Sequence, residues 1–229
     1  MRFNKAVLGV TALLFGSLAF STASADVVTV DLTYHFTKGG AVGQISEPEA
    51  HRTVWVTAGE FQLKTSGSDE ADVQAFCVQT GVNLLKGSLT YTKVAAEEHF
   101  TKLDVLANVQ SLFNHHYNEA VNPAAFQLAL WEIIHDTPTA LNLQDGSFKA
   151  TSNFGDARAN AQSMLDSLSG DYTDSKHGFQ LTVLKNDDSQ NLITWEKKVP
   201  VPEPGTLALL GLGLLAMGFA VRRRMGAGV

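Results

Sequence analysis

The sequence has almost no cysteine: Cys77 is the single one among 229 residues. A lone cysteine excludes an internal disulfide and leaves four roles open. It can be a small buried apolar residue, one half of an intermolecular disulfide, a catalytic nucleophile, or the sulfur of an internal acyl bond to a glutamine. As a nucleophile it would need a histidine. His116 and His135 are available, and Asn118 or Asn142 could orient one of them.

Signatures of metal and phosphate binding are also missing. The seven histidines match no metal-ligand spacing, and the adjacent His115 and His116 would point in different directions on a helix. The glycine-rich stretch GLGLLAMG lies in an apolar C-terminal segment, where glycine serves helix packing rather than phosphate binding. We therefore predict neither a metal nor another cofactor.

The first 25 residues have the pattern of a secretory signal peptide. Arg2 and Lys5 supply positive charge, and the apolar run AVLGVTALLFGSLAF follows. Ala23 and Ala25 then occupy the small-residue positions of a cleavage site. The run is short for a membrane span, which favours cleavage over an N-terminal anchor. We expect residues 1–25 to be removed during export.

The C-terminal part combines a spacer, an apolar segment and a basic tail. The spacer KKVPVPEP is rich in proline and so extended and stiff. An uncharged apolar segment follows, near the lower length limit for a membrane helix, and three arginines after it favour the cytoplasmic side. The expected division of the chain after the signal peptide is an extracellular domain at 26–196, a linker at 197–204, a transmembrane segment at 205–221 and a cytoplasmic basic tail at 222–229.

This C-terminal pattern resembles a known sorting signal. Pro202, Glu203 and Pro204, an apolar span, and a basic stop made of Arg222, Arg223 and Arg224 together resemble the PEP-CTERM signal of Gram-negative bacteria. The resemblance implies processing by an exosortase, a membrane protease-transpeptidase. It implies export across the inner membrane, anchoring by the C-terminal helix, and then residence at the cell surface or in the extracellular matrix.

Positive charge is scarce in the exported part. Residues 26–204 contain 12 of the 17 basic residues and all 23 acidic ones, which gives a formal net charge of −11. Such a charge disfavours nucleic acid and anionic membrane surfaces as partners. It suits an extracellular domain that meets cationic or amine-bearing partners.

Hydrophobic periodicity predicts an α+β fold, a sheet or sandwich-like β scaffold with a helical insert at about 100–170. Leu103, Leu106, Val109 and Leu112 recur at helical spacing, whereas residues 27–36 alternate with period two. The expected strands are 27–36, 53–65 (one or two strands), 73–80, 87–94, 178–185 and 191–198, and the expected helices are 101–113, 122–136 and 156–170. Residues 38–50 are predicted to form a loop.

Two short motifs resemble the Cys-Gln thioester domain of bacterial surface adhesins. The first is FCVQ around Cys77, and the second is FQLALWEIIHD, which begins at residue 126. Gln127, Ala129 and Trp131 match the family's Thr-Gln-x-Ala-Ile-Trp pattern, whereas Phe126 stands where the family has threonine. The resemblance spans about residues 70–170 and implies a mixed fold with an internal thioester.

The resemblance implies that Cys77 and Gln127 form the thioester, and we expect Phe76, Trp131 and His135 to support its pocket. A carboxamide is a poor electrophile, so the sulfur and the amide carbon must be held close together for ammonia to be expelled. The thioester would then acylate an amine, such as a protein lysine or an amino sugar, in a single turnover that is not enzymatic. The alternatives are a cysteine-dependent hydrolase or transamidase, and a non-reactive extracellular matrix protein.

Overall fold

We analysed a computed structural model of the whole chain. It describes residues 26–48, 51–65, 72–117, 122–138, 140–168 and 178–198. The predicted signal peptide, the transmembrane segment, the sorting motif and the basic tail lie outside these residues. No helix within the described ranges is long and apolar enough to cross a membrane.

The described chain runs through strands, then helices, then strands again. The strands are β1 (Val27–Glu47), β2 (Arg52–Thr65), β3 (Asp72–Cys77), β4 (Ser88–Ala95), β5 (Lys149–Ser152), β6 (Phe179–Lys185) and β7 (Leu192–Lys197). The helices are α1 (Ala96–His99), α2 (Leu103–His116), α3 (Pro123–Asp136) and α4 (Asp156–Asp166). This order confirms the predicted β scaffold with a helical insert, and only the short strand β5 interrupts the helices.

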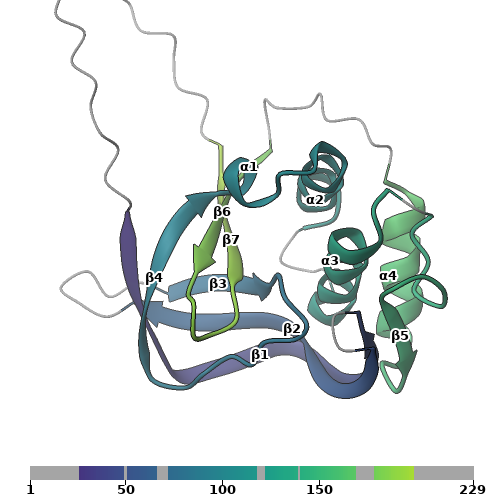
Figure 1. Ribbon diagram of the computed structural model, residues 1–229, viewed down its shortest axis with the longest axis horizontal. Coiled ribbons are helices and arrows are strands. Elements are labelled where there is room, and N and C mark those ends of the chain that lie inside the picture. The colour runs from purple at the N-terminus through teal and green to yellow at the C-terminus, as the bar shows by residue number, and fades with distance from the viewer. Residues whose placement is uncertain are drawn as a thin grey trace, which may run out of the picture.

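All the strand pairs are antiparallel, in the order β2-β3-β7-β6-β4-β1-β5. β1 also pairs with β2, so the sheet closes on itself through six of its strands. β1 is long enough to do this because its N-terminal part pairs with β4 and most of its length pairs with β2. Figure 1 shows the helical layer beside this curved sheet, with β5 at the end of β1.

The prediction of a loop over residues 38–50 was wrong for most of that range. β1 continues to Glu47 and pairs with β2 from Ala41 onward, after a register shift that follows Lys38. The glycines that suggested a loop serve close packing instead. A Cβ at Gly43 would lie 2.5 Å from the backbone oxygen of Ser152 in β5 and 2.6 Å from the Phe154 ring. Glycine is needed there because β5 approaches the strand so closely.

The helix α3 forms the centre of the helical layer. Asn122 caps its start by accepting a hydrogen bond from the Ala125 N–H (3.1 Å), and Pro123 follows in the first turn. Side chains all around this helix are buried, as expected for a helix enclosed by other elements. It packs against β2, α2 and α4, so a side chain on its inner face is held rigidly against the sheet.

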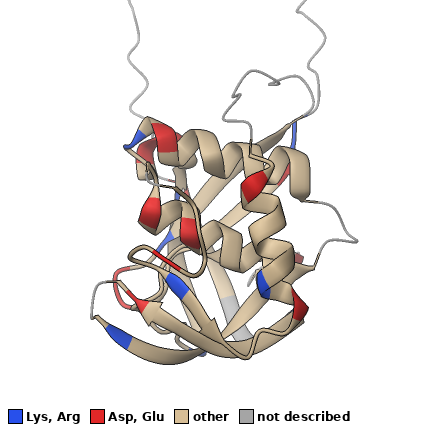
Figure 2. Ribbon diagram, turned by 90° about the vertical axis from the view of Figure 1, so that its right-hand side faces the viewer, with Lys and Arg blue, Asp and Glu red and all other residues tan. Residues whose placement is uncertain are grey.

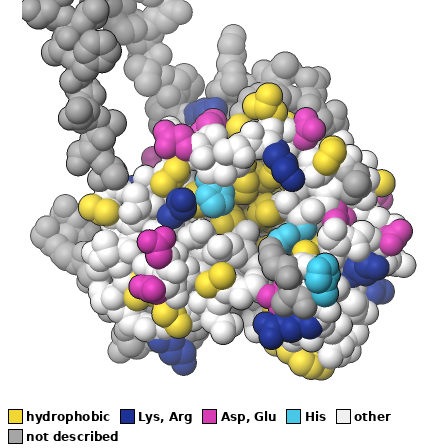
Figure 3. Space-filling view, in the orientation of Figure 1, with side chains coloured by type: hydrophobic (Ala, Val, Ile, Leu, Met, Phe, Trp, Pro, Cys, Tyr) yellow, Lys and Arg dark blue, Asp and Glu magenta, His cyan; other side chains and the backbone are white. Residues whose placement is uncertain are grey.

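Aromatic rings join the helices to the sheet. The Phe76 ring from β3 lies 4.7 Å from Phe126 in α3 and stacks at 5.3 Å on Trp195 in β7, measured between ring centroids. Figure 3 shows hydrophobic side chains gathered where the β6–β7 end of the sheet meets the helices. Such pairs add to the free energy of apolar burial and fix β3 and β7 relative to α3.

Candidate functional site

Cys77 is the last residue of β3 and is buried, with 3% of its surface exposed. It pairs with Leu192 of β7, and the next residue, Val78, donates its N–H to the Asn191 carbonyl at 3.1 Å. Burial raises the pKa of the Cys77 thiol well above its usual value. The sulfur is therefore protonated at neutral pH and differs from the activated thiolate of a cysteine hydrolase.

Gln127 lies against the main chain of Cys77. Its Oε1 accepts a hydrogen bond from the Cys77 N–H, and its Nε2 donates to the Cys77 carbonyl, both at 2.8 Å. The side chain is 1% exposed. The two residues are 50 positions apart in the sequence, and the structure brings the Gln127 side chain against the Cys77 backbone rather than against its sulfur. The Gln127 amide thus pairs with the N–H and C=O of Cys77 as a neighbouring strand would, at the end of β3.

The sulfur of Cys77 faces a different glutamine. Its Sγ donates a hydrogen bond to Oε1 of Gln190 at 2.6 Å, shorter than an ordinary N–H···O hydrogen bond. A C=O bond is about 1.23 Å long, so the Gln190 carbonyl carbon lies within about 3.8 Å of the sulfur. That approaches the separation of about 3–3.5 Å at which reacting atoms are poised for attack.

A set of buried hydrogen bonds holds Gln190 in place. Its Nε2 donates to the Gln79 carbonyl at 2.5 Å, and the Gln79 side chain accepts from the Asn191 N–H at 2.7 Å. From β4, the Tyr91 hydroxyl donates to Ser189 Oγ at 3.2 Å and to the main-chain carbonyl oxygen of Gln190 at 3.4 Å. Because every partner is itself buried or backbone-anchored, the amide has little freedom to turn away from the sulfur.

The geometry favours Gln190 over Gln127 as the acyl partner of Cys77. Both polar atoms of the Gln127 amide are bonded to the Cys77 backbone, whereas the Cys77 sulfur contacts the side-chain oxygen of Gln190. The sequence motifs did not point to Gln190, because it falls between the two strands expected at 178–185 and 191–198. The available signal was a glutamine placed where a polar turn passes into the apolar strand LIT.

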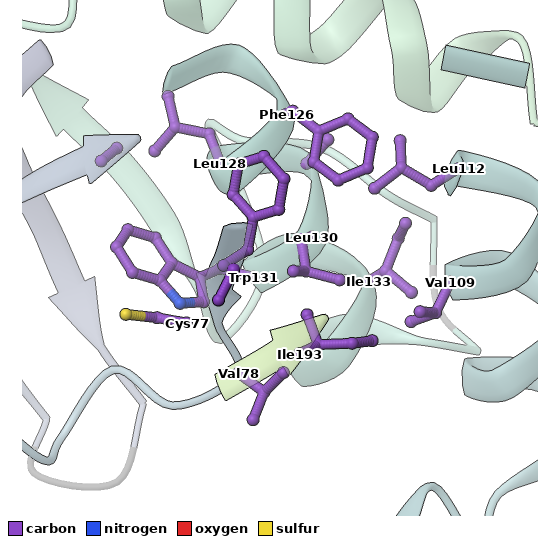
Figure 4. Packing of buried hydrophobic residues seen from close by; sticks show 14 of the residues in the cluster. Cys77, Val78, Val109, Leu112, Phe126, Leu128, Leu130, Trp131, Ile133 and Ile193 are labelled. Atoms are coloured by element: carbon purple, nitrogen blue, oxygen red, sulfur yellow. The ribbon is translucent and has the colours of Figure 1, made fainter. Parts of the chain in front are cut away.

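The predicted pocket residues lie close to this pair. Phe76 packs in the aromatic cluster beside Cys77, and Figure 4 shows the Trp131 indole next to Cys77 with its nitrogen edge toward the cysteine. The Trp131 ring is 2% exposed and lies 6.0 Å from Phe148. His135 stacks on Phe148 as well, and its Nε2 lies 3.3 Å from Thr80 Oγ1.

Of the two histidines considered for a hydrolase, His116 has its partner at the end of α4. Nε2 of His116 lies 3.0 Å from Ser167 Oγ at the end of α4, and burial lowers the pKa of His116. Asn142 donates its backbone N–H to Glu132 at 2.6 Å, and Asn118 lies outside the described residues. Desolvation alone accounts for the raised pKa of Cys77. No group of three or more metal-ligating residues occurs within the described ranges.

Two acidic side chains of α3, Glu132 and Asp136, lie in buried surroundings. Glu132 is fully buried, and burial raises its pKa to about 8 against the effect of the Asn142 N–H. One turn later, Asp136 accepts hydrogen bonds from the backbone of Ser147 at 2.8 Å and Phe148 at 2.9 Å. These two side chains tie the 140–148 loop to α3, and so position the Phe148 ring that packs on Trp131.

One comparison with known protein families concerns the C-terminal part of the chain. Residues 200–224 match the PEP-CTERM protein-sorting motif, so the chain carries the signal of an exported surface protein. This range includes Pro202, Glu203, Pro204 and the three arginines. No curated protein matches the sequence significantly.

Solved structures similar to this chain include bacterial surface domains. One is the N-terminal thioester domain of fibronectin-binding protein SfbI from Streptococcus pyogenes (13% identity, 77% of this chain and 95% of that chain covered, TM-score 0.44). Another is the N-terminal domain of the Streptococcus pyogenes pilus tip adhesin Cpa (17%, 61% and 85%, TM-score 0.40). A third is the N-terminal thioester domain of a Clostridium perfringens surface protein (8%, 75% and 99%, TM-score 0.41).

Proposed function

We propose that Cys77 and Gln190 form an internal thioester with which this exported protein binds an amine-bearing partner covalently. The observation that carries the proposal is the 2.6 Å contact between Cys77 Sγ and Gln190 Oε1 inside a buried site. Gln127 takes a supporting role, because its amide fixes the Cys77 backbone and so the direction of the sulfur.

Formation of the bond balances without any added reactant. The sulfur attacks the Gln190 carbonyl carbon, the C–S bond forms and the C–N bond breaks. The amide nitrogen leaves as ammonia with the proton that the thiol loses. The high pKa of the buried thiol makes this attack slow in general, so the proposal relies on the enforced proximity of the two groups.

In the capture of a partner, an amine replaces the Cys77 sulfur on the acyl carbon of Gln190. A neutral amine attacks the thioester carbonyl, an amide to Gln190 forms, and Cys77 recovers its proton as a thiol. The group is consumed in one turnover, so the protein acts as a covalent binder rather than an enzyme. The excess of acidic residues in the exported part favours approach of a cationic partner such as a protein lysine. Figure 2 shows acidic positions distributed over the helical side of the molecule.

The sorting motif supplies the cellular setting for such a binder. We expect an exosortase to process the C-terminal part, and we expect residues 205–221 to hold the protein in the membrane until that happens. An anchored or matrix-bound protein gains from a covalent link because the link does not dissociate. The site is compatible with attachment to a neighbouring cell, a matrix protein or an amino sugar.

Intact mass of the full-length exported protein tests the proposal. The wild-type mass is compared with that of Cys77→Ala and Gln190→Glu variants from the same host, so that processing at either end cancels. The wild type should lack the mass of one ammonia, and methylamine should add its full mass to it. The Cys77→Ala and Gln190→Glu variants should show neither the loss of ammonia nor the addition of methylamine.

Two results would contradict the proposal. The first is a wild-type protein with the plain sequence mass and a Cys77 thiol that alkylates on unfolding. The second is a Gln190→Glu protein that still loses ammonia, which would return the role of acyl partner to Gln127.

A further inference from the structure

The indole N–H of Trp131 is a buried donor with no acceptor. Trp131 is 2% exposed, and its Nε1 makes no hydrogen bond within the described part of the chain. A buried N–H without a partner is uncommon, since leaving it unpaired costs about 1–3 kcal/mol. Such a group calls for an explanation, and the surroundings of the ring provide one.

The ring is held beside the reacting groups. Trp131 lies one helical turn after Gln127, whose amide is bonded to the Cys77 backbone, so both side chains face β3. Figure 4 shows the nitrogen edge of the indole toward Cys77. The Phe148 ring, 6.0 Å away, packs on Trp131 and is fixed through Asp136.

Charge would build up during the reaction at the Gln190 oxygen, which contacts the sulfur of the cysteine beside the indole. When the sulfur attacks Gln190, the electrons of the C=O bond move to Oε1, which becomes an oxyanion in the tetrahedral intermediate. This oxygen lies 2.6 Å from Cys77 Sγ. The same oxygen carries the charge again when an amine attacks the finished thioester. The site is buried, so one donor there acts strongly.

We infer that the Trp131 indole N–H, which has no partner among the described residues, donates a hydrogen bond to the side-chain oxygen of Gln190 in the thioester and stabilises the oxyanion in both formation and aminolysis of the thioester. This inference rests on the proposed function. It goes beyond a shielding role for the ring, because it assigns the nitrogen edge a part in the chemistry.

The two roles of Trp131 predict opposite effects of Trp131→Phe. The phenyl ring is smaller and has no N–H. If the indole only shields the bond, the variant should react with methylamine faster than the wild type, because amines enter more easily. If the indole is the oxyanion donor, aminolysis should be slower, on the order of 100-fold. The intact-mass time course with methylamine measures this rate in the full-length exported protein.

The matched control is Trp195→Phe, which removes the indole of the aromatic cluster between β7 and the helices. This variant should react at the wild-type rate. An infrared difference spectrum of protein with ¹³C-labelled glutamine provides a second readout. The thioester carbonyl band should move to higher wavenumber in Trp131→Phe and stay in place in Trp195→Phe.

The outcomes separate the two proposals. A wild type without ammonia loss removes the thioester and this inference together. A wild type with a thioester, and a Trp131→Phe variant with an unchanged band and an equal or faster rate, overturns only the role of the indole. If Trp131→Phe fails to fold, benzothienylalanine at this position keeps the bicyclic shape without the N–H and must show the same slower rate and band shift.

Discussion

The side chain of Gln127 lies across the backbone of Cys77, and each of its two polar atoms makes a 2.8 Å hydrogen bond to that residue. The cysteine is thereby held between two glutamines, with Gln127 on its main chain and Gln190 on its sulfur. This division separates the residue that positions the thiol from the residue that the thiol would attack.

Gln127→Ala should lower the free energy of unfolding by about 2–4 kcal/mol, because it leaves the buried N–H and C=O of Cys77 unpaired. Thioester formation should become slower but should still occur, since Gln190 remains. Urea denaturation and intact mass measure the two effects. Gln62→Ala on the exposed side of β2 is the control and should change neither. Complete loss of the thioester in Gln127→Ala, together with its retention in Gln190→Glu, would show that Gln127 is the acyl partner.

His135→Ala distinguishes covalent binding from histidine-assisted catalysis. In the structure His135 contacts Thr80 and Phe148. If the thioester needs only proximity, the variant should still lack one ammonia and should still react with methylamine. Turnover of an amide or ester substrate by the wild type, abolished in His135→Ala, would support the hydrolase alternative. Intact mass and a chromogenic substrate assay report these outcomes.

Glu132 should make the protein less stable as the pH rises. Its pKa is raised from 4.5 to about 8 by burial, so between these values the unfolded chain releases a proton that the folded chain keeps. The free energy of unfolding should therefore fall with pH, by at most about 1.4 kcal/mol per unit, and level off above pH 8.

The variant Glu132→Gln keeps the oxygen that accepts the Asn142 N–H and removes the titration. It should be more stable than the wild type at neutral pH, with a smaller loss of stability between pH 5 and pH 8. Urea denaturation across this range measures the difference. Glu97→Gln, at an exposed position of α1, should follow the wild type. Parallel curves for wild type and Glu132→Gln would show that the carboxyl ionises normally in the folded protein.

Gly146→Ala should destabilise the loop that carries Phe148. Gly146 has φ +106°, and an added Cβ would lie 2.6 Å from Asp136 Oδ2. We expect a loss of about 2–3 kcal/mol from backbone strain and this clash. Gly87 is the matched control, because it has φ +114° with no atom within 4 Å of the added Cβ. Thermal or urea unfolding of Gly146→Ala and Gly87→Ala separates the clash from the backbone strain. An equal loss of stability in the two variants would mean that the loop moves aside.

Much of the secondary structure follows from local patterns. The strands β2, β6 and β7, the helical spacing of α2, and the Asn122–Pro123 start of α3 were all readable, because each depends on residues close by in the sequence. The extension of β1 to Glu47 was not readable. Glycines in this segment suggested a loop, and only the tertiary structure shows that Gly43 lies against β5 and Gly39 against Pro123 of α3.

The sequence by itself determined the single cysteine, the order of strands and helices, the sorting motif, and Gln127 as a residue close to Cys77, though in the role of acyl partner. The tertiary structure alone decided which glutamine meets the sulfur. Gln190 is 113 residues from Cys77 and reaches it only because β3 pairs with β7 in a sheet that closes on itself. Strand pairing at such a separation depends on the packing of the whole domain, which no local pattern of residues records.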